Sequence, residues 1–496
     1  MKIKIVTSAV FLLLINNFSA IAQIEGTLQY MNSLPQVVIN NPAFVPKYKF
    51  SLGLPFSSIY QGYTNNGFSY NDLVTRKDGQ VKADLTKWIK NLPDKTFISP
   101  AASIDFLRFG FKINPKLYIT ANVTAKEYGY IKLPKDLASV FVEGNAPYVN
   151  STINFSAAVE ALSYLETAVG ASYEVNKKLR VGGRIKLLHG MASVTTQTSD
   201  VSIAVDGNYQ MTASADLLVK TSGINSITNS GYEFSKEWKN YFKNRGMAID
   251  IGATYQLLDK LTLNASLIDI GGIKWKNDLY QYSLDKAKAN YTFSGINATD
   301  LINGTANDFM DAQVDSIKNN FKLKEGSTSS FRTPLPGKIF LGGNYELMRN
   351  LNVGAVFYAE KFHEKFSPGW TTSLNKNFGR AISTTLSYTM SNRSFNNFGA
   401  GLSFNLAPVQ LYIVGDNLLR IPGSLMVHKT VNNYINTAQV INIRLGLNFV
   451  FGWDKGGIPP PKTKSVNSQN KTNAPETSNV RQSKRKRYRN YTKEQK

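Results

Sequence analysis

The stretch Val440–Trp453, VINIRLGLNFVFGW, decides the fold class. Large apolar residues occupy its odd positions, and its even positions are polar or small apart from Val440 and Val450. A strand points successive side chains to opposite faces, so this stretch has one apolar face and one polar face. A transmembrane β-strand needs roughly 9–11 residues of this pattern, with aromatic residues at the interface. We interpret it as the closing strand of an outer-membrane barrel. The alternative is a half-buried strand of a soluble sandwich.

The same alternation recurs along the chain, in residues 117–125, 179–187, 261–267, 351–359, 382–390 and 398–406. Several of these segments are joined by turns of a few residues, at 114–116, 176–178, 258–260 and 349–350. The other connections are long, at 71–99, 133–149, 221–246, 284–333 and 417–438. Short turns that alternate with long loops are typical of outer-membrane barrels.

We therefore predict an all-β fold, a transmembrane antiparallel β-barrel of 14 strands. A closed bacterial barrel has an even number of strands, so 16 is the alternative. Short helices are expected in the long loops, at residues 81–92 and 306–317. A soluble surface adhesin would instead require the alternating strands to pack against each other.

The composition fits a barrel with a wet interior. The 496 residues are 42% hydrophobic, and the mean hydropathy is -0.23. Beyond the N-terminus, no run approaches the roughly 18 apolar residues of a membrane helix. The chain has no cysteine and three histidines, which lie far apart in the sequence. Disulfides and thiolate metal sites are excluded, and no metal or cofactor is expected.

Four regions follow from the order of the chain. Residues 1–22 have a basic start, a short apolar run and Ala20-Ile21-Ala22, which predict a signal peptide. Residues 23–46 include turn-forming prolines and are a possible plug. Residues 47–453 form the barrel. The tail, residues 454–496, is predicted to be disordered, because it is rich in Asn, Ser, Thr and Lys. Both termini are expected in the periplasm.

The tail carries 12 Lys/Arg and 3 Asp/Glu, a charge of 12 − 3 = +9, out of +23 for the chain. The predicted export signal argues against nucleic acid as its partner. In the periplasm this charge could bind anionic lipid, peptidoglycan carboxylates or an acidic protein, or remain solvated. The tail residues considered for partner binding are Arg481, Lys484, Arg485, Lys486, Arg487 and Arg489.

Several segments carry a family resemblance: residues 41–43, 67–73, 134–137, 144–147, 181–186, 268–271, 274–275 and 414–417. As an ordered set over most of residues 25–453, they resemble a Bacteroidota family of outer-membrane barrels of unknown function. More distantly, a signal peptide followed by Asn41-Pro42-Ala43 is similar to the FadL-like and PorV/PorP-like barrels. That resemblance implies either uptake of hydrophobic molecules or a helper role in secretion and barrel-assembly machines.

Charged residues on the polar faces of the strands are expected in the lumen. These are Arg180, Arg184 and Lys186, with Asn442 and Arg444 on the closing strand. A basic lumen could attract anionic solutes. We favour the alternative, in which these side chains pair with lumen carboxylates and fill the barrel.

Asp269 and Asp416 each end an apolar run, and we expect them to cap turns with their own side chains. Paired metal ligands or gate residues are the alternative role. No nucleophile, phosphate loop or metal-ligand spacing stands out, so an enzyme is not expected.

Two functions remain open. The first is a FadL-like channel or binder for a small hydrophobic molecule, which predicts an apolar pocket and a gap or kink in the wall. The second is an accessory subunit of an outer-membrane protein complex, which predicts a filled lumen and a tail or loop face that binds another protein. Outer-membrane lipid is a partner in both, and the first is slightly preferred.

Overall fold

The computed structural model describes residues 25–66, 74–77, 80–144, 146–228, 242–285, 287–293, 306–362, 365–391, 394–417 and 440–453. The contacts between Cα atoms divide the chain into residues 1–454 and 455–496, and all described residues belong to the first part. The predicted signal peptide and tail lie outside the described residues. So does the 67–73 segment of the family resemblance.

The described part is a closed 14-strand antiparallel β-barrel, which confirms the predicted fold class and strand number. Several of the 14 wall strands consist of two or three consecutive pieces. Going around the wall, they are β1 (Tyr48–Gly53) with β2 (Ile59–Asn65), β5 (Lys95–Lys112), β6 (Leu117–Pro134), β7 (Ser151–Asn154) with β8 (Ala158–Glu174), β9 (Leu179–Val205), β10 (Met211–Ser222) with β11 (Arg245–Leu258), β12 (Leu261–Trp275) with β13 (Leu279–Leu284) and β14 (Asn290–Phe293), β15 (Lys324–Ser327) with β16 (Phe331–Pro334) and β17 (Gly337–Met348), β18 (Leu351–Phe362), β19 (Lys365–Phe378), β20 (Ile382–Ser391), β21 (Ser394–Leu406), β22 (Val409–Asp416) and β23 (Val440–Trp453).

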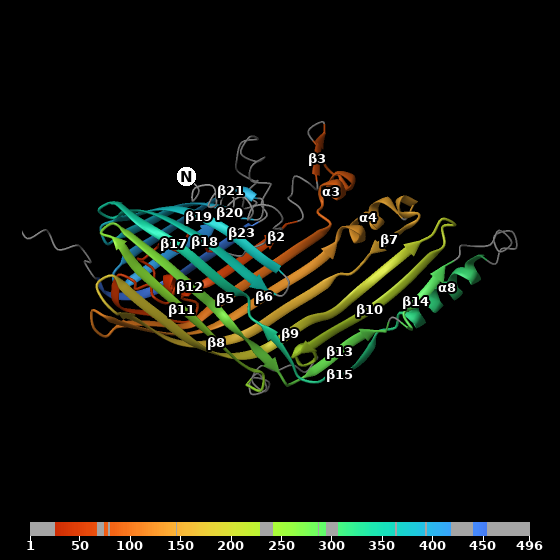
Figure 1. Ribbon diagram of the computed structural model, residues 1–496, viewed down its shortest axis with the longest axis horizontal. Coiled ribbons are helices and arrows are strands. Elements are labelled where there is room, and N and C mark those ends of the chain that lie inside the picture. Colours follow the sequence, from red (N-terminus) through yellow and green to blue (C-terminus); the bar gives the residue numbers. More distant parts are fainter. Residues whose placement is uncertain are drawn as a thin grey trace, which may run out of the picture. The chain divides into compact units, whose positions relative to one another are not determined.

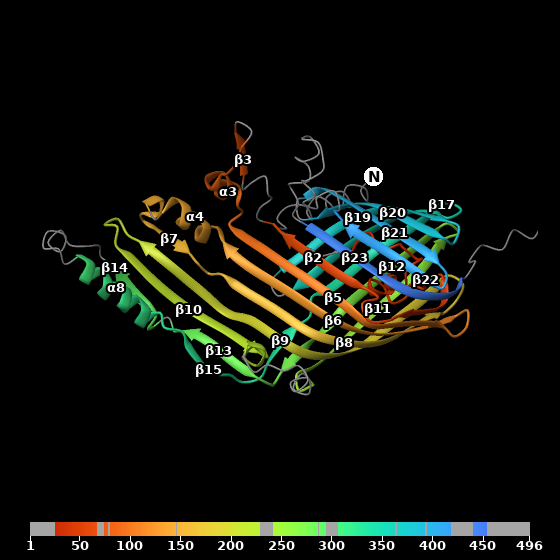
Figure 2. The same cartoon turned by 180° about the vertical axis from the view of Figure 1, so that it is seen from behind.

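The predicted closing strand closes the barrel. β23 pairs with β22 on one edge and with both β1 and β2 on the other. The opposite edge of β1 and β2 pairs with β5, as the view from behind shows (Figure 2). The first and last strands therefore leave no open edge in the wall, and every wall strand has two neighbours.

Side chains alternate between the two faces in the reverse of a soluble protein. Along β20 the serines and threonines at positions 383, 385, 387, 389 and 391 are buried, whereas Leu386 and Met390 are exposed. On β23, Asn442, Arg444 and Asn448 are buried, and Leu445, Leu447 and Phe451 are exposed. An apolar outer band around a polar interior is what a barrel surrounded by lipid requires.

Some elements lie beyond this apolar band. β9 has 27 residues, far more than the roughly 9–11 that cross a bilayer, and its far half pairs with β7 and β10. β10 pairs in turn with β13 and β14, and β13 pairs with β15. We call this group, residues 193–205 of β9 with β7, β10, β13, β14 and β15, the sheet extension. It projects past the other strands at the end away from the short turns (Figure 1).

The long connections contain the remaining elements. They are a separate hairpin of β3 (Val74–Lys77) and β4 (Gln80–Ala83), and the helices α3 (Leu85–Asn91), α4 (Lys135–Glu143), α5 (Ile224–Thr228) and α8 (Ala306–Asn320). Two short 3-10 helices are η1 (Pro35–Ile39) and η2 (Ala146–Tyr148). α3 and α8 fall where helices were predicted. None of the helices that the structure describes is long and apolar enough to cross a membrane.

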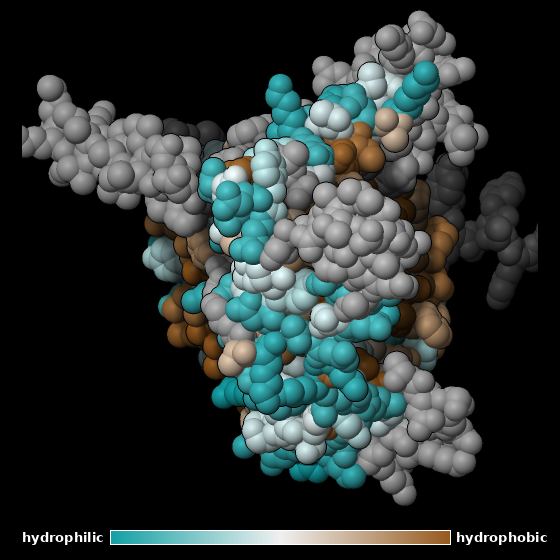
Figure 3. All heavy atoms as spheres, turned by 90° about the vertical axis from the view of Figure 1, so that its right-hand side faces the viewer, coloured by the Kyte–Doolittle hydropathy of each residue, from teal (hydrophilic) through white to brown (hydrophobic). Residues whose placement is uncertain are grey.

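Seen from the end that carries the sheet extension, hydrophilic residues face the viewer and hydrophobic residues lie along the flanks (Figure 3). Exposed apolar side chains on the flanking strands include Ile185, Met247, Leu341, Leu386 and Phe398. This separation of polar end and apolar flank fits strands that cross a bilayer.

A charge in the apolar band tests this assignment. Leu386 on β20 is 62% exposed, and in a soluble protein Leu386→Arg would change stability little. In a bilayer we expect a loss of about 2–4 kcal/mol, because the guanidinium lies among acyl chains. The control is Leu406→Arg at the turn end of β21, which is 69% exposed and should cost about 0–1 kcal/mol. Urea unfolding in lipid vesicles measures both. Equal effects would contradict a lipid-facing β20.

Candidate functional site

The lumen is the candidate site. Residues 25–46 occupy the part of it nearest the short turns. Thr27 donates from its backbone N–H to Oδ1 of Asp416 at 3.0 Å and from its hydroxyl to the same atom at 2.6 Å. The amide of Gln36 donates to Asn448 at 2.9 Å, on the neighbouring strand. On the opposite wall, Ser266 of β12 donates to the carbonyl of Asn40 at 2.6 Å. The segment thus bonds to strands on opposite sides, which places it inside the barrel.

Glycines in the wall give this segment its space. A Cβ atom built on Gly182 of β9 would overlap the backbone of Pro42. On other strands, added Cβ atoms would overlap Asn41 from Gly252, Tyr30 from Gly354, Thr27 from Gly399 and Met31 from Gly401. The wall and the segment are therefore complementary along the whole length of the segment.

Two apolar clusters anchor the segment. Leu28, Met31 and Leu34 pack with Tyr412 and Val414 of β22. A second group joins Tyr30, Val37, Val38 and Phe44 of the segment to side chains of β6, β12, β17 and β18. These clusters are an apolar core built between the segment and an otherwise polar inner wall. Each fully buried side chain of this kind stabilises the structure by roughly 1.5–3 kcal/mol.

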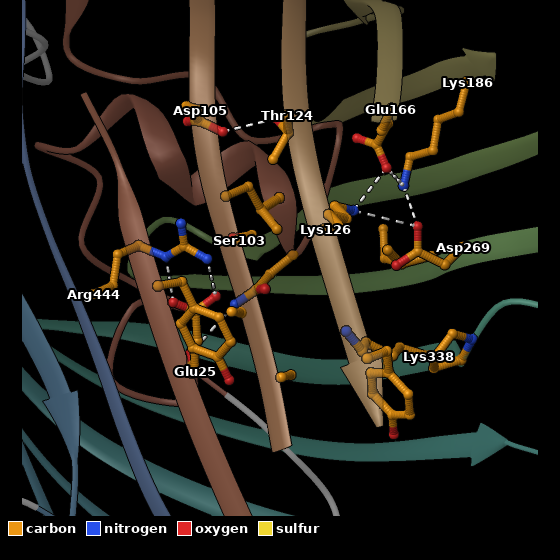
Figure 4. A pocket seen from close by; sticks show the side chains of 18 of the residues that line it. Glu25, Ser103, Asp105, Thr124, Lys126, Glu166, Lys186, Asp269, Lys338 and Arg444 are labelled. Carbon is orange, nitrogen blue, oxygen red and sulfur yellow. Dashed lines mark hydrogen bonds and ion pairs between the residues drawn. The ribbon is translucent and has the colours of Figure 1, made fainter. Parts of the chain in front are cut away.

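Above the segment lies a network of buried charges (Figure 4). Lys186 pairs with Asp250 at 2.7 Å and also with Asp269. Arg184 pairs with Asp250 at 3.2 Å. Lys126 pairs with Glu166 at 2.7 Å. These residues come from β6, β8, β9, β11 and β12, so the network ties five consecutive wall strands together across the lumen.

Further ion pairs extend the network to the other wall. Arg108 pairs with Asp105 at 2.6 Å within β5. Arg444 forms two bonds with Glu25, one of them 2.9 Å from Nη2 to Oε2. Lys338 lies 3.8 Å from Glu360. Within the described residues, these ion pairs join six cations, Arg108, Lys126, Arg184, Lys186, Lys338 and Arg444, to six carboxylates, Glu25, Asp105, Glu166, Asp250, Asp269 and Glu360.

Between these charges a small cavity of about 90 Å³ remains, and Glu25, Lys126 and Lys338 are among its lining residues. Sites for drug-sized molecules usually measure roughly 300–1,000 Å³ and are mostly apolar. A hydrophobic molecule would have to displace paired charges to enter here, so the centre of the lumen does not suit one.

The lumen is filled again beyond the charges. Tyr128, Tyr164, Leu188, Trp275 and Phe362 belong to one buried cluster with side chains from at least seven strands. The edge of Phe362 faces the ring of Tyr128 at 4.9 Å between centroids. From the short-turn end upward, the lumen thus contains the N-terminal segment, the paired charges with their cavity, and an aromatic layer.

The wall has a pocket of its own, of about 310 Å³. Its lining runs from β2 across β5, β6 and β8 to β9 and α5, and it is mostly small or apolar: Pro100, Ala101, Ala102, Gly129, Ala161, Leu162, Ala192, Val194 and Ile224 among others. Proline has no N–H to donate to the β6 ladder, and the β5–β6 register passes from Ile98↔Ile131 directly to Ala101↔Tyr128. Leu162 and Tyr128 face the lumen cluster, whereas exposed Glu127 faces outward. The pocket therefore lies in the wall at an interruption of its ladder.

The sequence-predicted lumen residues are placed as follows. Arg184, Lys186, Asn442 and Arg444 are buried inside the barrel. Arg180 has the same strand parity but lies at the turn end of β9, where it pairs with Glu174 at 2.7 Å and with turn carbonyls. It is a rim residue and takes no part in the buried network.

The structure corrects one of the two expected turn caps, Asp269. Asp269 lies within β12, at a bulge with a φ of 61°, and its buried side chain accepts from Lys186 instead of capping a turn. The extra residue of the bulge directs this carboxylate into the lumen. Asp416 ends β22 as predicted, and its side chain accepts from Thr27 of the N-terminal segment. The residues from 418 to 439 lie outside the described part, so its role as a turn cap stays a prediction.

The Asn41-Pro42-Ala43 motif lies in the lumen, where the Asn41 amide donates to the carbonyls of Ala253 and Ala265. Its side-chain oxygen accepts from the N–H of Ala43 at 2.8 Å, which fixes the turn. The hydroxyl of Ser172 on β8 donates a hydrogen bond to the carbonyl of Ala43 at 3.1 Å.

Sequence reasoning missed eight of the twelve residues in these ion pairs: Glu25, Asp105, Arg108, Lys126, Glu166, Asp250, Lys338 and Glu360. Glu166 and Asp250 have the inward parity of their strands, since each stands between outward residues such as Ile249 and Ile251. That alternation was a usable signal. Glu25 had no such signal, because its segment is not a strand. The tail residues, Arg481 to Arg489, lie outside the described residues.

Within the described part of the chain, no group of three or more His, Asp or Glu side chains is placed to hold a metal ion. The paired charges can fix the segment and bind water. Nothing in their arrangement resembles a nucleophile with its base.

A family model described as "Family of unknown function (DUF5723)" matches residues 42–416. A search of curated proteins gives no match. Among solved structures, the chain is similar to the Ralstonia pickettii toluene transporter TbuX, with 10% identity, a TM-score of 0.41 and coverage of 84% of this chain and 94% of that one. The chain is also similar to a Pseudomonas aeruginosa FadL homologue, with 11% identity and a TM-score of 0.39, over 84% of this chain and 94% of that one. A further similar structure is the translocator domain of the autotransporter NalP from Neisseria meningitidis, with 8% identity and a TM-score of 0.33, over 81% of this chain and 88% of that one.

The buried network predicts unequal effects along β9. Lys186→Met leaves Asp250 and Asp269 buried without their main partner, and we expect a loss of about 3–5 kcal/mol. The matched control, Arg180→Met on the same strand, removes a partly exposed pair and should cost about 0–1 kcal/mol. The urea midpoint of the purified barrel reports both. Similar losses would contradict a structural role specific to the network.

The close contact between Gly182 and Pro42 predicts a local effect of substitution. Gly182→Ala should push Asn41-Pro42-Ala43 out of place, because the new methyl group overlaps the Pro42 backbone. Its neighbour Gly183 is the control, since a Cβ there meets nothing nearer than 3.8 Å. The chain lacks cysteine, so Ala43→Cys provides a single label at a buried position. Maleimide labelling should accelerate at least about tenfold with Gly182→Ala, on the assumption that about 1.4 kcal/mol of seating energy is lost. If it does not change, the segment is not held by this contact.

Proposed function

The chain belongs to the DUF5723 family, which has no assigned function, and we propose that it is an outer-membrane barrel that binds or admits a small hydrophobic molecule through its wall. The observation that carries this proposal is the wall pocket at Pro100. Its volume of about 310 Å³ and its lining of small and apolar side chains suit such a ligand.

The filled lumen supports entry through the wall rather than along the axis. The N-terminal segment, the paired charges and the aromatic layer leave a central cavity of about 90 Å³. Among the described residues, these three layers fill the lumen around that cavity. Passage onward would require residues 25–46 to move, so the segment acts as a plug held by Glu25–Arg444 and Thr27–Asp416.

We further propose that the short turns and both termini lie in the periplasm and that the sheet extension is extracellular. Short turns on the periplasmic side and long loops outside are the rule for such barrels. A Bacteroidota origin and a relation to PorV/PorP-like barrels stay predictions from the sequence. The domain limits 1–22, 23–46, 47–453 and 454–496 belong to the same proposal.

A bulky residue in the wall pocket tests the ligand proposal. Ala161→Phe should fill the pocket between β6 and β9 and lower ligand binding at least about tenfold, because the ring takes the volume that the ligand would occupy. The control is Ala121→Phe, which lies on the same outer face nearer the turns. Binding of the fluorescent probe N-phenyl-1-naphthylamine to the purified barrel is the measurement. Binding that both variants retain would place the ligand elsewhere.

A second function is favoured by a different observation, the outward face of the sheet extension. Several of its apolar side chains are only half-buried: Met211, Leu217, Val219, Tyr280, Tyr282, Tyr291 and Phe293. Tyrosine, phenylalanine and methionine are enriched at protein interfaces. An accessory subunit of an outer-membrane complex would use such a face, with the basic tail as a further contact.

The second function predicts a stoichiometric partner. Affinity purification from gently solubilised membranes should recover it with the full chain and lose it with Tyr280→Ser/Tyr282→Ser, which removes two aromatic anchors. A chain ending at Trp453 tests the tail separately. If all three forms yield the barrel alone, the accessory function is contradicted and the wall-pocket proposal is strengthened.

A further inference from the structure

A row of cations lies on the outer surface of the barrel, across β11, β12 and β16. Arg245 is the direct cross-strand neighbour of Lys274, and Lys274 is the direct neighbour of Arg332. All three side chains are exposed. We call these three residues the basic row. β11 and β12 lie side by side in the part of the barrel that faces the viewer (Figure 1).

Strand alternation shows that the basic row points outward. The residues on either side of Lys274, Ile273 and Trp275, are fully buried in the lumen cluster. Phe331 and Thr333, on either side of Arg332, are buried as well. The three cations therefore point away from the lumen charges described above and form a separate site.

Like charges directly opposite each other destabilise a sheet unless a counter-charge is present. Among the residues that the structure describes, none forms an ion pair with Arg245, Lys274 or Arg332. Nε of Arg245 donates a hydrogen bond to the carbonyl of Phe242 at 2.8 Å. Two more exposed lysines, Lys243 and Lys276, lie at the ends of β11 and β12. Within the described residues, the row is thus a positive patch without a paired counter-charge.

Its height on the barrel matches the membrane surface. On β11 the outward residues from Leu257 to Met247 are apolar or aromatic apart from small ones, a stretch of 11 residues. That is the length of a strand that crosses a bilayer, and Arg245 is the next outward residue. Met247 is 60% exposed and Ile249 is 46% exposed, so the lipid-facing band ends directly below the row.

Arg332 leans toward that band. A Cβ built on Gly272 would lie 3.2 Å from Nε of Arg332, and Gly272 pairs with Pro334 one outward position nearer the short turns. The side chain of Arg332 therefore lies over Gly272, next to the apolar band. Guanidinium groups bind phosphate through paired N–H donors, and lysine adds a point charge.

We propose that the basic row binds the phosphate of a membrane lipid whose acyl chains lie on the apolar band below. The apolar surface continues directly from the row, and a soluble phosphate would leave it unused. The inference depends on the membrane location proposed above and is independent of the wall-pocket ligand.

The test uses native mass spectrometry of the full mature chain in neutral detergent. Phosphatidic acid presents a bare phosphate, and phosphatidylcholine with the same acyl chains is the zwitterionic comparison. We expect selective retention of phosphatidic acid by the wild type. Arg245→Gln/Lys274→Gln/Arg332→Gln should lower that affinity about a hundredfold, at roughly fivefold for each cation. The matched control is Lys177→Gln/Lys178→Gln/Lys260→Gln, three exposed lysines in the short turns.

Retention that falls equally in the control would overturn the proposal, because net charge would then explain binding. Displacement by an equal concentration of inorganic phosphate would also overturn it, since the site would then bind soluble phosphate. Unchanged retention in the triple variant would exclude the row. Both triple variants should keep the wild-type heat-modified mobility on gels, which shows that the barrel is folded.

Discussion

The pairing of β23 with β1 and β2 is the constraint on which the rest of the structure depends. In lipid, each backbone N–H and C=O must find a partner within the protein, so a sheet can cross a bilayer only when its edges meet. The register Ser51↔Val450 and Tyr60↔Arg444 achieves this, with β1 and β2 sharing β23 between them. Once the wall is closed, the space inside it has to be filled by side chains, by water or by another part of the chain.

This protein fills that space in layers with different physics. The N-terminal segment contributes apolar packing, and the wall makes room for it with glycines. The middle layer pairs six cations with six carboxylates, which is stable only because each buried charge has a partner. The aromatic layer returns to apolar packing. The polar residues of the inner wall cannot form either apolar layer. The N-terminal segment and the inward-facing aromatic residues are therefore essential parts of the folded core.

Much of the fold could be predicted because apolar and polar side chains alternate with a period of two residues along a strand. A lipid environment requires this alternation on every strand that crosses the membrane. Residues 440–453 and 382–390 indicated strand positions and faces directly, and the even-number rule limited the candidate strands to 14 or 16. The sheet extension could not be predicted this way. Beyond the bilayer neither face has to be uniformly apolar, so residues such as Thr196, Thr198 and Ser202 show a weaker alternation.

Individual strand residues of the candidate site were predictable, but their pairing and the contribution of Glu25 were not. Parity alone placed Arg184, Lys186 and Arg444 inside. Their partners come from other strands and depend on register, and Asp269 reaches the network only because a bulge shifts it by one residue. Glu25 depends on how residues 25–46 fold back into the barrel, which no local pattern encodes.

The position of the pairs also limits where function can reside. A buried network that joins opposite walls resists change, because separating one pair exposes two charges to an apolar or unpaired environment. The surfaces that can vary without that cost are the wall at Pro100, where the ladder is already interrupted, and the outer face beyond the apolar band. A barrel whose centre is held by its own charges therefore leaves its wall and its projecting strands as the surfaces where the ligand or the partner proposed above would bind.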